Sequence, residues 1–596
     1  MQHLDFVHIS TILGKRDAWR KNMFERNAKN GVTVKAYRGD AMTLLAFNIE
    51  ENLLKSNFVG FSIRYKTPSG HSYFLVNRIN FEGDGALTES DKAPFQKFRW
   101  IHVPGTFHQN VTNPSYGLYK YFVTPRYWSA QNNALEPLDE DLTVEVDIDV
   151  DRYSDRSVGI SFTRSFLTSQ AFVRRFGENN NLIPTGNWLF DTSSVFCTNE
   201  GVKYTYEDVY GWLGYTARQK TIALLQEVLN NKSLSADMFA YDFDEPVVGK
   251  LCLQLAAEGR IRVILDNSTD HTGQNASETD FESTFNTAKQ GAAAMFRGRF
   301  SRLCHHKVII VKENGTPTKV LTGSTNFSVT GFCVNANHVV LFTNGEIAGL
   351  YEQVFEASWG AAKMKTFAHS QYAAKPFDVA GQNLPNISFT FSPHPDDVAN
   401  QVLKGVADSI TGAKSSVLFC IMSLDESSGG PVYPTLRSVQ NNEGLFTYGI
   451  TDSTKYISLY KPGSKKGILV NAKNLVKDLP PPFDKEETFN AHNIHHKFVV
   501  VDFNRPEAAV YFGSSNLALG GEESNGDNLV CVEDTDIATV FAIEAVRLVD
   551  HFEFRAKKTD SQGNDKVLKL DKTSGWALRY FDEKDIKYVD RNLFCD

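Results

Sequence analysis

The chain has 596 residues, of which 42% are hydrophobic and 22% charged, a composition typical of a globular protein with several domains. Its formal net charge of −8 gives no overall basic footprint, which argues against broad, nonspecific binding of nucleic acid. Residues 1–20 lack the apolar core of a signal peptide, and no stretch approaches the roughly 20 apolar residues of a membrane span. The 7 cysteines are irregularly spaced and indicate buried free thiols, so we expect a cytoplasmic protein.

Residues 1–190 carry short runs of alternating apolar and polar residues separated by turn signals. Leu142–Val150 alternates strictly, as a strand with one wet face does. Similar runs occur at Phe58–Tyr65, Ser72–Asn77, Tyr116–Val123 and Val158–Phe162. Several short strands in series favour a β-sandwich. No catalytic constellation lies in this part, so we expect a module for packing or homo-oligomerisation, or one that presents substrate or binds a partner.

The periodicity changes at about residue 200, and residues 191–380 are predicted to form an α/β lobe. Helix, strand, helix and strand are expected in turn at Thr216–Asn230, Leu234–Phe243, Val247–Glu258 and Ile261–Leu265. Residues 268–300 are polar and rich in Gly, Ala and Asn, which indicates a loop.

Residues 381–596 repeat this plan as a second α/β lobe. Pro376–Pro395 is typical of a linker, and the expected elements after it are a helix at Val398–Ile410, strands at Ser416–Met422 and Phe446–Asp452, and a helix at Ile537–Phe552. Lys461–Pro482 is a basic insertion that either is a solvated loop or rims a cleft. The aromatic tail, which includes Trp576 and Phe594, is expected to pack over a lobe.

One pattern occurs in both lobes with the same internal spacing. The first copy is His305-His306-Lys307 followed by Gly323-Ser324-Thr325-Asn326, and the second is His495-His496-Lys497 followed by Gly513-Ser514-Ser515-Asn516. Matched duplication of this kind points to two related units.

The residue types in this pattern suit a phosphodiester. Residues two apart on a strand share a face, so His305 and Lys307 point the same way, as do His495 and Lys497. Two such faces in one cleft supply two imidazoles for nucleophilic attack and proton transfer. Lys and Asn side chains then hold the phosphoryl oxygens. Arg297, Arg299 and Arg302 precede the first copy, where they either meet a phosphate or are merely solvated.

This doubled His-x-Lys and Gly-Ser-x-Asn pattern resembles the signature of the phospholipase D superfamily, and the aromatic tail more weakly resembles bacterial phospholipase D-like proteins. The resemblance implies that the two copies form one site, that one His becomes a covalent phosphohistidine, and that neither a metal nor a cofactor is needed. The implied catalytic residues are His305, His495, Lys307, Lys497, Asn326 and Asn516. Ser324 and Ser514 are expected to hydrogen-bond the substrate nearby.

The first copy departs from the family pattern at two positions. The Asp expected after the apolar run is Lys312, whereas the second copy keeps Asp502. Downstream, where the family often has Asn-x-Glu, the first copy ends in Asn337 and the second in Asp527. A nearby carboxylate favours the imidazolium form of a His. The sequence therefore predicts His495 as the general acid and His305 as the nucleophile, with Asp527 in support.

Two other functions remain open from the sequence. One is a non-catalytic scaffold that binds phosphate or nucleic acid. The other is a metal-dependent hydrolase whose ligands are His492, His495, His496 and Asp502. The second His of each pair, His306 and His496, is expected to face away from the Lys and to be structural. Phospholipid and nucleic acid both remain candidate substrates, and a phospholipid would add a peripheral membrane contact.

Overall fold

The computed structural model describes residues 22–596 apart from several segments. The segments outside the description are 106–107, 109–113, 166–169, 180, 185–186, 382–383, 443, 453–456, 461–467, 471–492 and 554–567. Most of the basic insertion 461–482, and His492, therefore lie outside the described residues. No helix among the described residues is long and apolar enough to cross a membrane. All 7 cysteines are free thiols.

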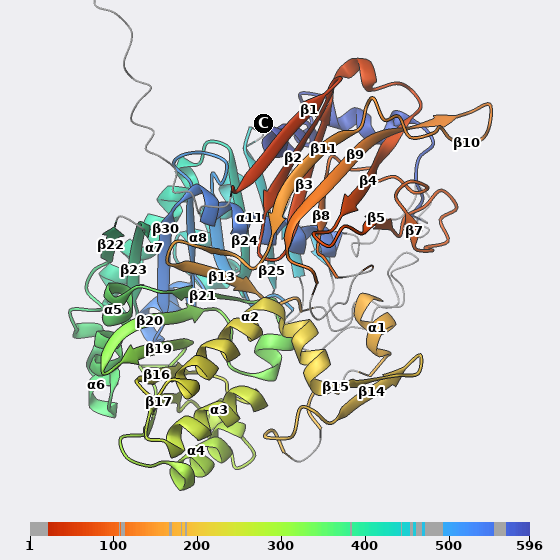
Figure 1. Cartoon of the computed structure of the whole chain (residues 1–596). Coiled ribbons are helices and arrows are strands. Elements are labelled where there is room, and N and C mark those ends of the chain that lie inside the picture. Colours follow the sequence, from red (N-terminus) through yellow and green to blue (C-terminus); the bar gives the residue numbers. More distant parts are fainter. Residues whose placement is uncertain are drawn as a thin grey trace, which may run out of the picture.

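The N-terminal part contains two antiparallel sheets that share one apolar core (Figure 1). The first sheet has the order β1 (Phe24–Lys29), β2 (Val32–Arg38), β3 (Thr43–Ile49) and β8 (Arg99–His102). The second has the order β10 (Ala134–Leu135), β9 (Gly117–Ser129), β4 (Phe58–Lys66) and β5 (Ser72–Phe74), with β11 (Val144–Val150) also paired to β9. Alternation drives the packing, since the apolar face of each sheet is buried between them: the rings of Phe47 and Phe61 lie 4.9 Å apart.

Lobe 1 is built on an eight-stranded mixed sheet. Its order is β12 (Ser154–Asp155), β13 (Val158–Phe162), β21 (His338–Phe342), β20 (Thr316–Gly323), β19 (Val308–Glu313), β16 (Leu234–Ala240), β17 (Ile261–Asp266) and β18 (Ala294–Gly298). One face is covered by α2 (Tyr206–Asn230), α3 (Pro246–Ala257) and α4 (Ser277–Ala288). The other face carries α5 (Gly345–Ser358) and meets lobe 2.

Lobe 2 repeats the arrangement on a nine-stranded sheet. Its order is β22 (Phe377–Gly381), β23 (Leu384–Phe391), β30 (Asn528–Glu533), β29 (Ala509–Gly513), β28 (Lys497–Val501), β24 (Ser416–Met422), β25 (Phe446–Asp452), β26 (Ile457–Tyr460) and β27 (Ile468–Val470). Its helices include α7 (Asp396–Gly412), α8 (Val432–Val439), α10 (Leu519–Ser524) and α11 (Thr535–Glu553). Strands β21-β20-β19-β16-β17 of lobe 1 correspond in order to β30-β29-β28-β24-β25, so the expected repeat of mixed sheets flanked by helices is present.

Three expectations about the chain's organisation are wrong. Val158–Phe162 is not a strand of the N-terminal module but β13, which pairs with β21 at the position that β23 occupies in lobe 2. Lobe 1 thus begins well before residue 190, and the segment expected as a linker forms the β22–β23 hairpin. Residues 268–300 contain α4 and β18 because Phe281 and Phe285, one helical turn apart, are enough to anchor an otherwise polar helix.

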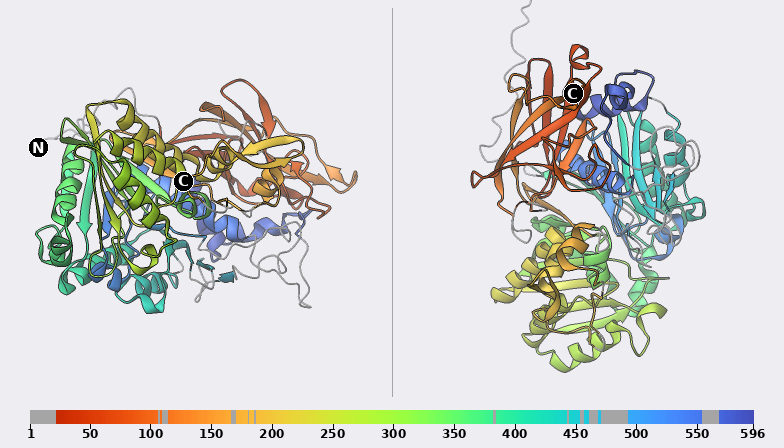
Figure 2. Two further views of the ribbon diagram at one scale, coloured as in Figure 1. Left: turned by 90° about the horizontal axis from the view of Figure 1, so that it is seen from below. Right: turned by 90° about the vertical axis from the view of Figure 1, so that its right-hand side faces the viewer.

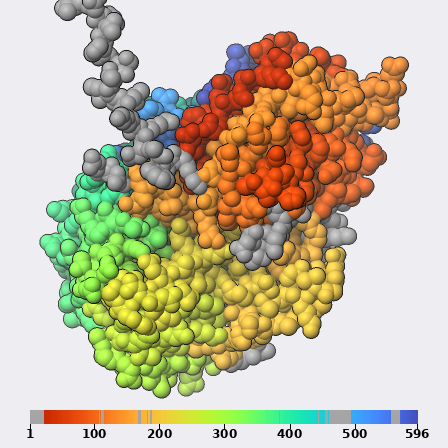
Figure 3. Space-filling model, viewed as in Figure 1, coloured from red at the N-terminus to blue at the C-terminus, as the bar shows by residue number. Residues whose placement is uncertain are grey.

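The C-terminal tail joins the N-terminal sheets to lobe 2. Its elements are η7 (Ser574–Tyr580) and α12 (Ile586–Cys595). Trp576 packs 5.4 Å from Phe58 in the N-terminal core, whereas Phe594 lies 5.6 Å from Phe446 of lobe 2. The tail therefore does not simply cover a lobe as expected. Figure 2 shows the three parts side by side, and Figure 3 shows the N-terminal part in direct contact with lobe 1.

Candidate active site

Both motif copies lie at the seam between the lobes because each lobe sends a loop onto the other. Residue Ala336 of lobe 1 forms a β-bridge with Ile494, and the His495 amide donates to the Ala336 carbonyl at 3.0 Å. In the reverse direction, the Gly526 amide of lobe 2 donates to the Leu303 carbonyl at 2.8 Å. Each crossing loop ends two residues after an Asn (Asn335 or Asn525), at Asn337 or Asp527, which brings that last side chain to the other lobe's His.

His305 is paired with the carboxylate of Asp527. Its Nδ1 lies 2.7 Å from Asp527 Oδ1, and both side chains are almost fully buried. Burial, with the nearby Lys307 ammonium, lowers the pKa of His305 to about 4. Although burial opposes ionisation of Asp527, His305 and Lys307 hold its pKa at about 2. Near pH 7 His305 is therefore neutral, with its Nδ1 proton directed to the carboxylate and its Nε2 lone pair available.

His495 is paired with an amide instead. Its Nδ1 lies 2.9 Å from Asn337 Oδ1 and 3.1 Å from the Ser324 carbonyl oxygen. Both neighbours are acceptors, so Nδ1 carries a proton and donates it. The premise that Asp527 supports His495 is therefore wrong: the loops cross the seam, and the carboxylate of lobe 2 reaches the His of lobe 1.

The two motif lysines are close enough for their charges to repel each other. Lys307 Nζ donates to the His305 carbonyl at 2.5 Å, and Lys497 Nζ donates to the His495 carbonyl at 2.9 Å. Burial lowers the pKa of Lys307 to about 8, and burial together with Lys307 lowers the pKa of Lys497. Two buried, mutually repelling ammonium groups with one carboxylate nearby favour the binding of an anion.

The two motif amides are also incompletely satisfied. The side-chain oxygens of Asn326 and Asn516 are buried and have no hydrogen-bond partner among the described residues. Asn326 Nδ2 contacts Asp242 Oδ2 at 3.3 Å. Unsatisfied buried polar groups are rare in folded proteins and are concentrated where a ligand or reaction completes them.

Ser324 and Ser514 are fully buried behind the site and not on its surface. Ser324 Oγ donates to Asn337 Oδ1 at 2.8 Å, and Ser514 Oγ accepts from the Asn528 amide at 3.1 Å. These contacts position the loops that carry Asn337 and Asp527. That the serines also hydrogen-bond the substrate stays a prediction.

The departure at Lys312 lies far from the histidines along its strand. Lys312 Nζ forms an ion pair with Asp237 at 2.5 Å. Asp502, at the equivalent position in lobe 2, accepts hydrogen bonds from the backbone amides of residues 414–416 at 2.7–3.0 Å. Both residues stabilise strand ends, so the difference between them does not change the site.

The second His of each pair is buried away from the Lys, as expected. His496 and His338 share a hydrogen bond, with 3.1 Å between their Nδ1 atoms. The Nε2 atom of His496 lies 3.1 Å from Glu544 Oε1. Glu544 in turn pairs with Arg547 at 2.7 Å. This buried chain continues to the site, because His338 Nδ1 lies 3.1 Å from Ser324 Oγ. None of His338, Glu544 and Arg547 carries a sequence signal beyond its place in or near an apolar run.

An acidic cluster beside His305 was also missed by the sequence reasoning. Ligand atoms of Asp242, His271 and Glu278 all lie within 4.8 Å of one another, a donor set that fits a divalent cation. Asp266 fixes His271 at Nδ1 (2.9 Å) and also accepts from the Cys304 amide at 2.6 Å. The sequence signal for this cluster was an Asp at the end of the same strand in each lobe, Asp266 in β17 and Asp452 in β25. Asp452 accepts a hydrogen bond from the Ile494 amide at 2.9 Å, as Asp266 does from the Cys304 amide.

The remaining sequence candidates separate from the site. Arg297 donates to the carbonyls of Asp266 and His271 at 2.9 and 2.6 Å, and Arg302 donates to Asn525 Oδ1 at 2.8 Å, so both serve the protein's own structure. His495, His496 and Asp502 have separate partners and do not form a cluster within the described residues. His492, the remaining member of that proposed metal set, lies outside them.

Comparison with known proteins gives matches in both lobes. A family model described as "Cardiolipin synthase, PLD-like domain" matches residues 225–359 and 406–548. A mitochondrial cardiolipin hydrolase of Xenopus tropicalis is 28% identical over 177 residues, which are 30% of this chain and 77% of that protein. Among solved structures, Nuc of Salmonella typhimurium, a phospholipase D family member, is 22% identical with a TM-score of 0.19. The match covers 23% of this chain and 85% of the Nuc chain. Polyphosphate kinase of Porphyromonas gingivalis is 11% identical with a TM-score of 0.35, and the match covers 56% of this chain and 48% of that chain.

Proposed function

Because the chain belongs to the phospholipase D superfamily and is a phosphodiester hydrolase, we propose that it cleaves a phospholipid through a covalent phosphohistidine on His305. The observation that carries this assignment is the unequal support of the two histidines. Asp527 accepts from Nδ1 of His305 at 2.7 Å, whereas His495 has the neutral amide of Asn337. A carboxylate behind an imidazole stabilises the positive charge that develops when the other nitrogen attacks.

The first half of the reaction transfers the phosphoryl group to the enzyme. His305 Nε2 attacks phosphorus while the bond from phosphorus to the leaving oxygen breaks. His495, with its Nδ1 held by Asn337, delivers a proton from Nε2 to that oxygen, and the alcohol leaves. Lys307, Lys497, Asn326 and Asn516 hold the non-bridging oxygens throughout.

The second half restores the enzyme. His495, now neutral at Nε2, takes a proton from water, and the resulting hydroxide attacks the phosphohistidine on the side that the alcohol has left. The nitrogen–phosphorus bond breaks, the phosphate monoester departs, and His305 returns to its neutral state against Asp527. No step in this sequence requires a metal ion.

The charges around the site favour a phospholipid over a polynucleotide. Asp242 Oδ2 lies 3.3 Å from Asn326 Nδ2, and Asp244 and Glu278 are close enough to Asp242 for their charges to interact. A nucleic acid brings further phosphates on both sides of the scissile bond, and the half-buried Asp242 carboxylate beside Asn326 would repel them. A phospholipid presents an isolated phosphodiester and avoids this repulsion.

The experiment is a substrate panel in EDTA with mass-spectrometric trapping. Phosphatidylcholine and cardiolipin vesicles are compared with single-stranded DNA, duplex DNA and RNA, using wild type, His305→Ala and His495→Ala. We expect cleavage of lipid by wild type only, and an acid-quenched phosphoenzyme that maps to His305. A phosphoenzyme on His495 would reverse the assignment of the two histidines.

The same panel separates the alternatives. Cleavage of nucleic acid alone would replace the lipid proposal while leaving the mechanism intact. Activity lost in EDTA, restored by a divalent cation and abolished in Asp242→Asn would favour a metal-dependent hydrolase built on the acidic cluster. Binding without turnover, unchanged in His305→Ala, would favour the scaffold.

A further inference from the structure

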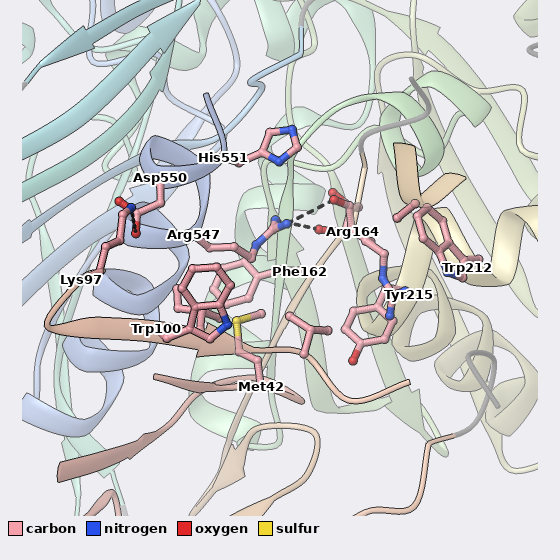
Figure 4. Close-up of a pocket in the computed structure, with 14 residues that line it drawn as sticks. Met42, Lys97, Trp100, Phe162, Arg164, Trp212, Tyr215, Arg547, Asp550 and His551 are labelled. Carbon is pink, nitrogen blue, oxygen red and sulfur yellow. Dashed lines mark hydrogen bonds and ion pairs between the residues drawn. The ribbon is translucent and has the colours of Figure 1, made fainter. Parts of the chain in front are cut away.

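A cavity lies where the N-terminal sheets and both lobes meet, and neither His305 nor His495 lines it. Its volume is about 320 Å³. Figure 4 shows its walls: Trp100 comes from β8, Phe162 from β13, Trp212 and Tyr215 from α2, and Arg547 from α11. The cavity is near the lower end of the roughly 300–1,000 Å³ typical of small-molecule sites.

Arg164 in the cavity wall is a buried cation without a carboxylate partner among the described residues. The residue is 8% exposed, and all three guanidinium nitrogens lack a partner among the described residues. The group is instead stacked over the rings of Trp212 and Tyr215, at 4.7 and 4.3 Å from their centroids. Burial lowers the pKa of Arg164 from its ordinary value.

Two other buried arginines are paired with carboxylates, whereas Arg164 is the described arginine for which all three guanidinium nitrogens are buried without a partner. Arg218 donates to Glu245 at 2.9 Å and to Glu207 at 2.6 Å. Arg99 donates to Asp550 at 2.6 Å and to Asp590 at 2.8 Å. A buried charge is costly unless an opposite charge compensates it, so the structure leaves an anionic partner to be supplied from outside.

The other charged groups of the cavity do not supply that anion. Asp550 is shared by Arg99 and Lys97, and Glu544 is bound by Arg547 through two contacts of 2.7 Å. Arg547 also donates to the carbonyls of Thr163 and Arg164 at 3.4 and 3.3 Å (Figure 4). Because Glu544 compensates Arg547, Arg164 remains the uncompensated positive charge in this part of the cavity.

Much of the remaining lining is apolar. Its apolar members are Met42, Trp100, Ile101, Val103, Phe162 and Ala171. We propose that this cavity binds an amphipathic anion, whose carboxylate or phosphate pairs with Arg164 while its apolar body lies between Trp100 and Phe162. The planar guanidinium suits both headgroups, because each can accept two parallel hydrogen bonds from it. A free fatty acid and a single-chain phosphate ester are the two sources of this chemistry.

This site is independent of the proposed function. It does not use the motif histidines or lysines, and it would exist equally in an enzyme that cleaves nucleic acid. Its failure would leave the assignment of His305 and His495 untouched.

The test is calorimetric titration of the full chain with four probes of matched size. Decanoate and decyl phosphate carry both the chain and the anion, decanol carries only the chain, and inorganic phosphate carries only the anion. We expect one-to-one binding of at least one anionic amphiphile, at least 10-fold tighter than decanol and phosphate. The preferred probe then tells the carboxylate source from the phosphate source.

Variants connect binding to the cavity. Arg164→Met keeps the side-chain volume but removes the cation and should weaken the anionic probe at least 10-fold. Arg175→Met is the matched control, since Arg175 also stacks on aromatic rings but does not line the cavity. Should Arg164→Met fail to fold, Ala171→Trp tests the same site by filling it, and it should abolish binding. Equal affinity for decanol and the anions, unchanged affinity in the folded cavity variants, or no binding at all would overturn the proposal.

Discussion

At the scale of single residues, the two histidines of the site differ in the group behind the ring. Asp527 is ionised behind His305, whereas Asn337 behind His495 is neutral. We expect Asp527→Asn to lower kcat by roughly 10²- to 10⁴-fold with little change in KM, because the amide cannot stabilise the charged imidazole of the transition state. Steady-state kinetics checks this, and Lys312→Ala serves as the control because Lys312 pairs with Asp237 away from the site. A loss confined to KM would show that Asp527 acts in binding.

The pH profile should report the buried lysine. Burial lowers the pKa of Lys307 to about 8, so its ammonium and its hold on phosphate are lost as pH rises through 8. On the acid side, protonation of His305 near pH 4 removes the nucleophile. We therefore expect kcat/KM of the free enzyme to fall on both sides, with limbs near pH 4 and pH 8.

Lys307→Arg tests the alkaline limb. Arginine stays protonated far above pH 8, so the limb should move to higher pH even though the altered donor geometry lowers activity at neutral pH. An alkaline limb that stays near pH 8 in this variant would assign the titration to another group.

The sequence predicted the central residues of the site but not their partners. His305, Lys307 and Asn326, with their counterparts in lobe 2, could be identified because local spacing on strands and turns places them. Which carboxylate supports which His depends on loops that cross between lobes, and no local pattern contains that information. His271 and Glu544 were missed for the same reason, since each acquires its role from a partner on another element.

At the scale of elements, the loop that carries Asp527 is seated by a glycine. A Cβ at Gly526 would overlap the ring of Phe300, which is itself buried at 2% exposure. We expect Gly526→Ala to push the loop away from lobe 1 and to lower kcat on the order of 10²-fold, since small misplacements of catalytic groups are costly.

The first copy provides the matched control for this variant. The equivalent position is already an alanine, Ala336, which bridges to Ile494 through backbone atoms. Ala336→Gly keeps those hydrogen bonds and should leave kcat within a few-fold of wild type, at a stability cost of about 0.5–1 kcal/mol. Kinetics and circular dichroism on both variants decide the matter: a fully active Gly526→Ala would mean that the Phe300 contact does not position Asp527.

Helices and strands were predicted correctly where burial gives the sequence a regular apolar pattern. The prediction failed where the position of a strand depends on which other strand it pairs with. Strands such as β16, β17 and β24 are rich in buried apolar residues and were recognisable. The β22–β23 hairpin was mistaken for a linker because Pro385 and Asn386 are typical turn residues, yet they lie at the start of β23, which pairs with both β22 and β30. Strand β13 was recognised as a strand, but its sheet depends on a partner, β21, that lies far along the chain.

At the scale of the whole molecule, the three parts are joined by buried charges as well as by apolar contacts. Arg99 of β8 donates to Asp550 of α11 and to Asp590 of α12, so one side chain links the N-terminal sheets, lobe 2 and the tail. The chain order alone gives no hint of this link, since residues from three distant segments form it. The apolar core is likewise continuous, with Phe162 of β13 packed 5.5 Å from Phe541 of lobe 2.

We expect Arg99→Met to destabilise the protein by at most about 3–5 kcal/mol, because it removes the nearest cation of Asp550 and Asp590 and leaves them only the more distant Lys97 and Lys587. Since the lost contacts join different parts, the melting transition should move to lower temperature and separate into more than one step in calorimetry. Arg505→Met is the control, because the Arg505–Glu507 pair is 44% and 53% exposed and its loss should not change the transition. A uniform shift without separation would mean that the apolar core alone holds the parts in one cooperative unit, and an unchanged transition would mean that the aspartates find other partners.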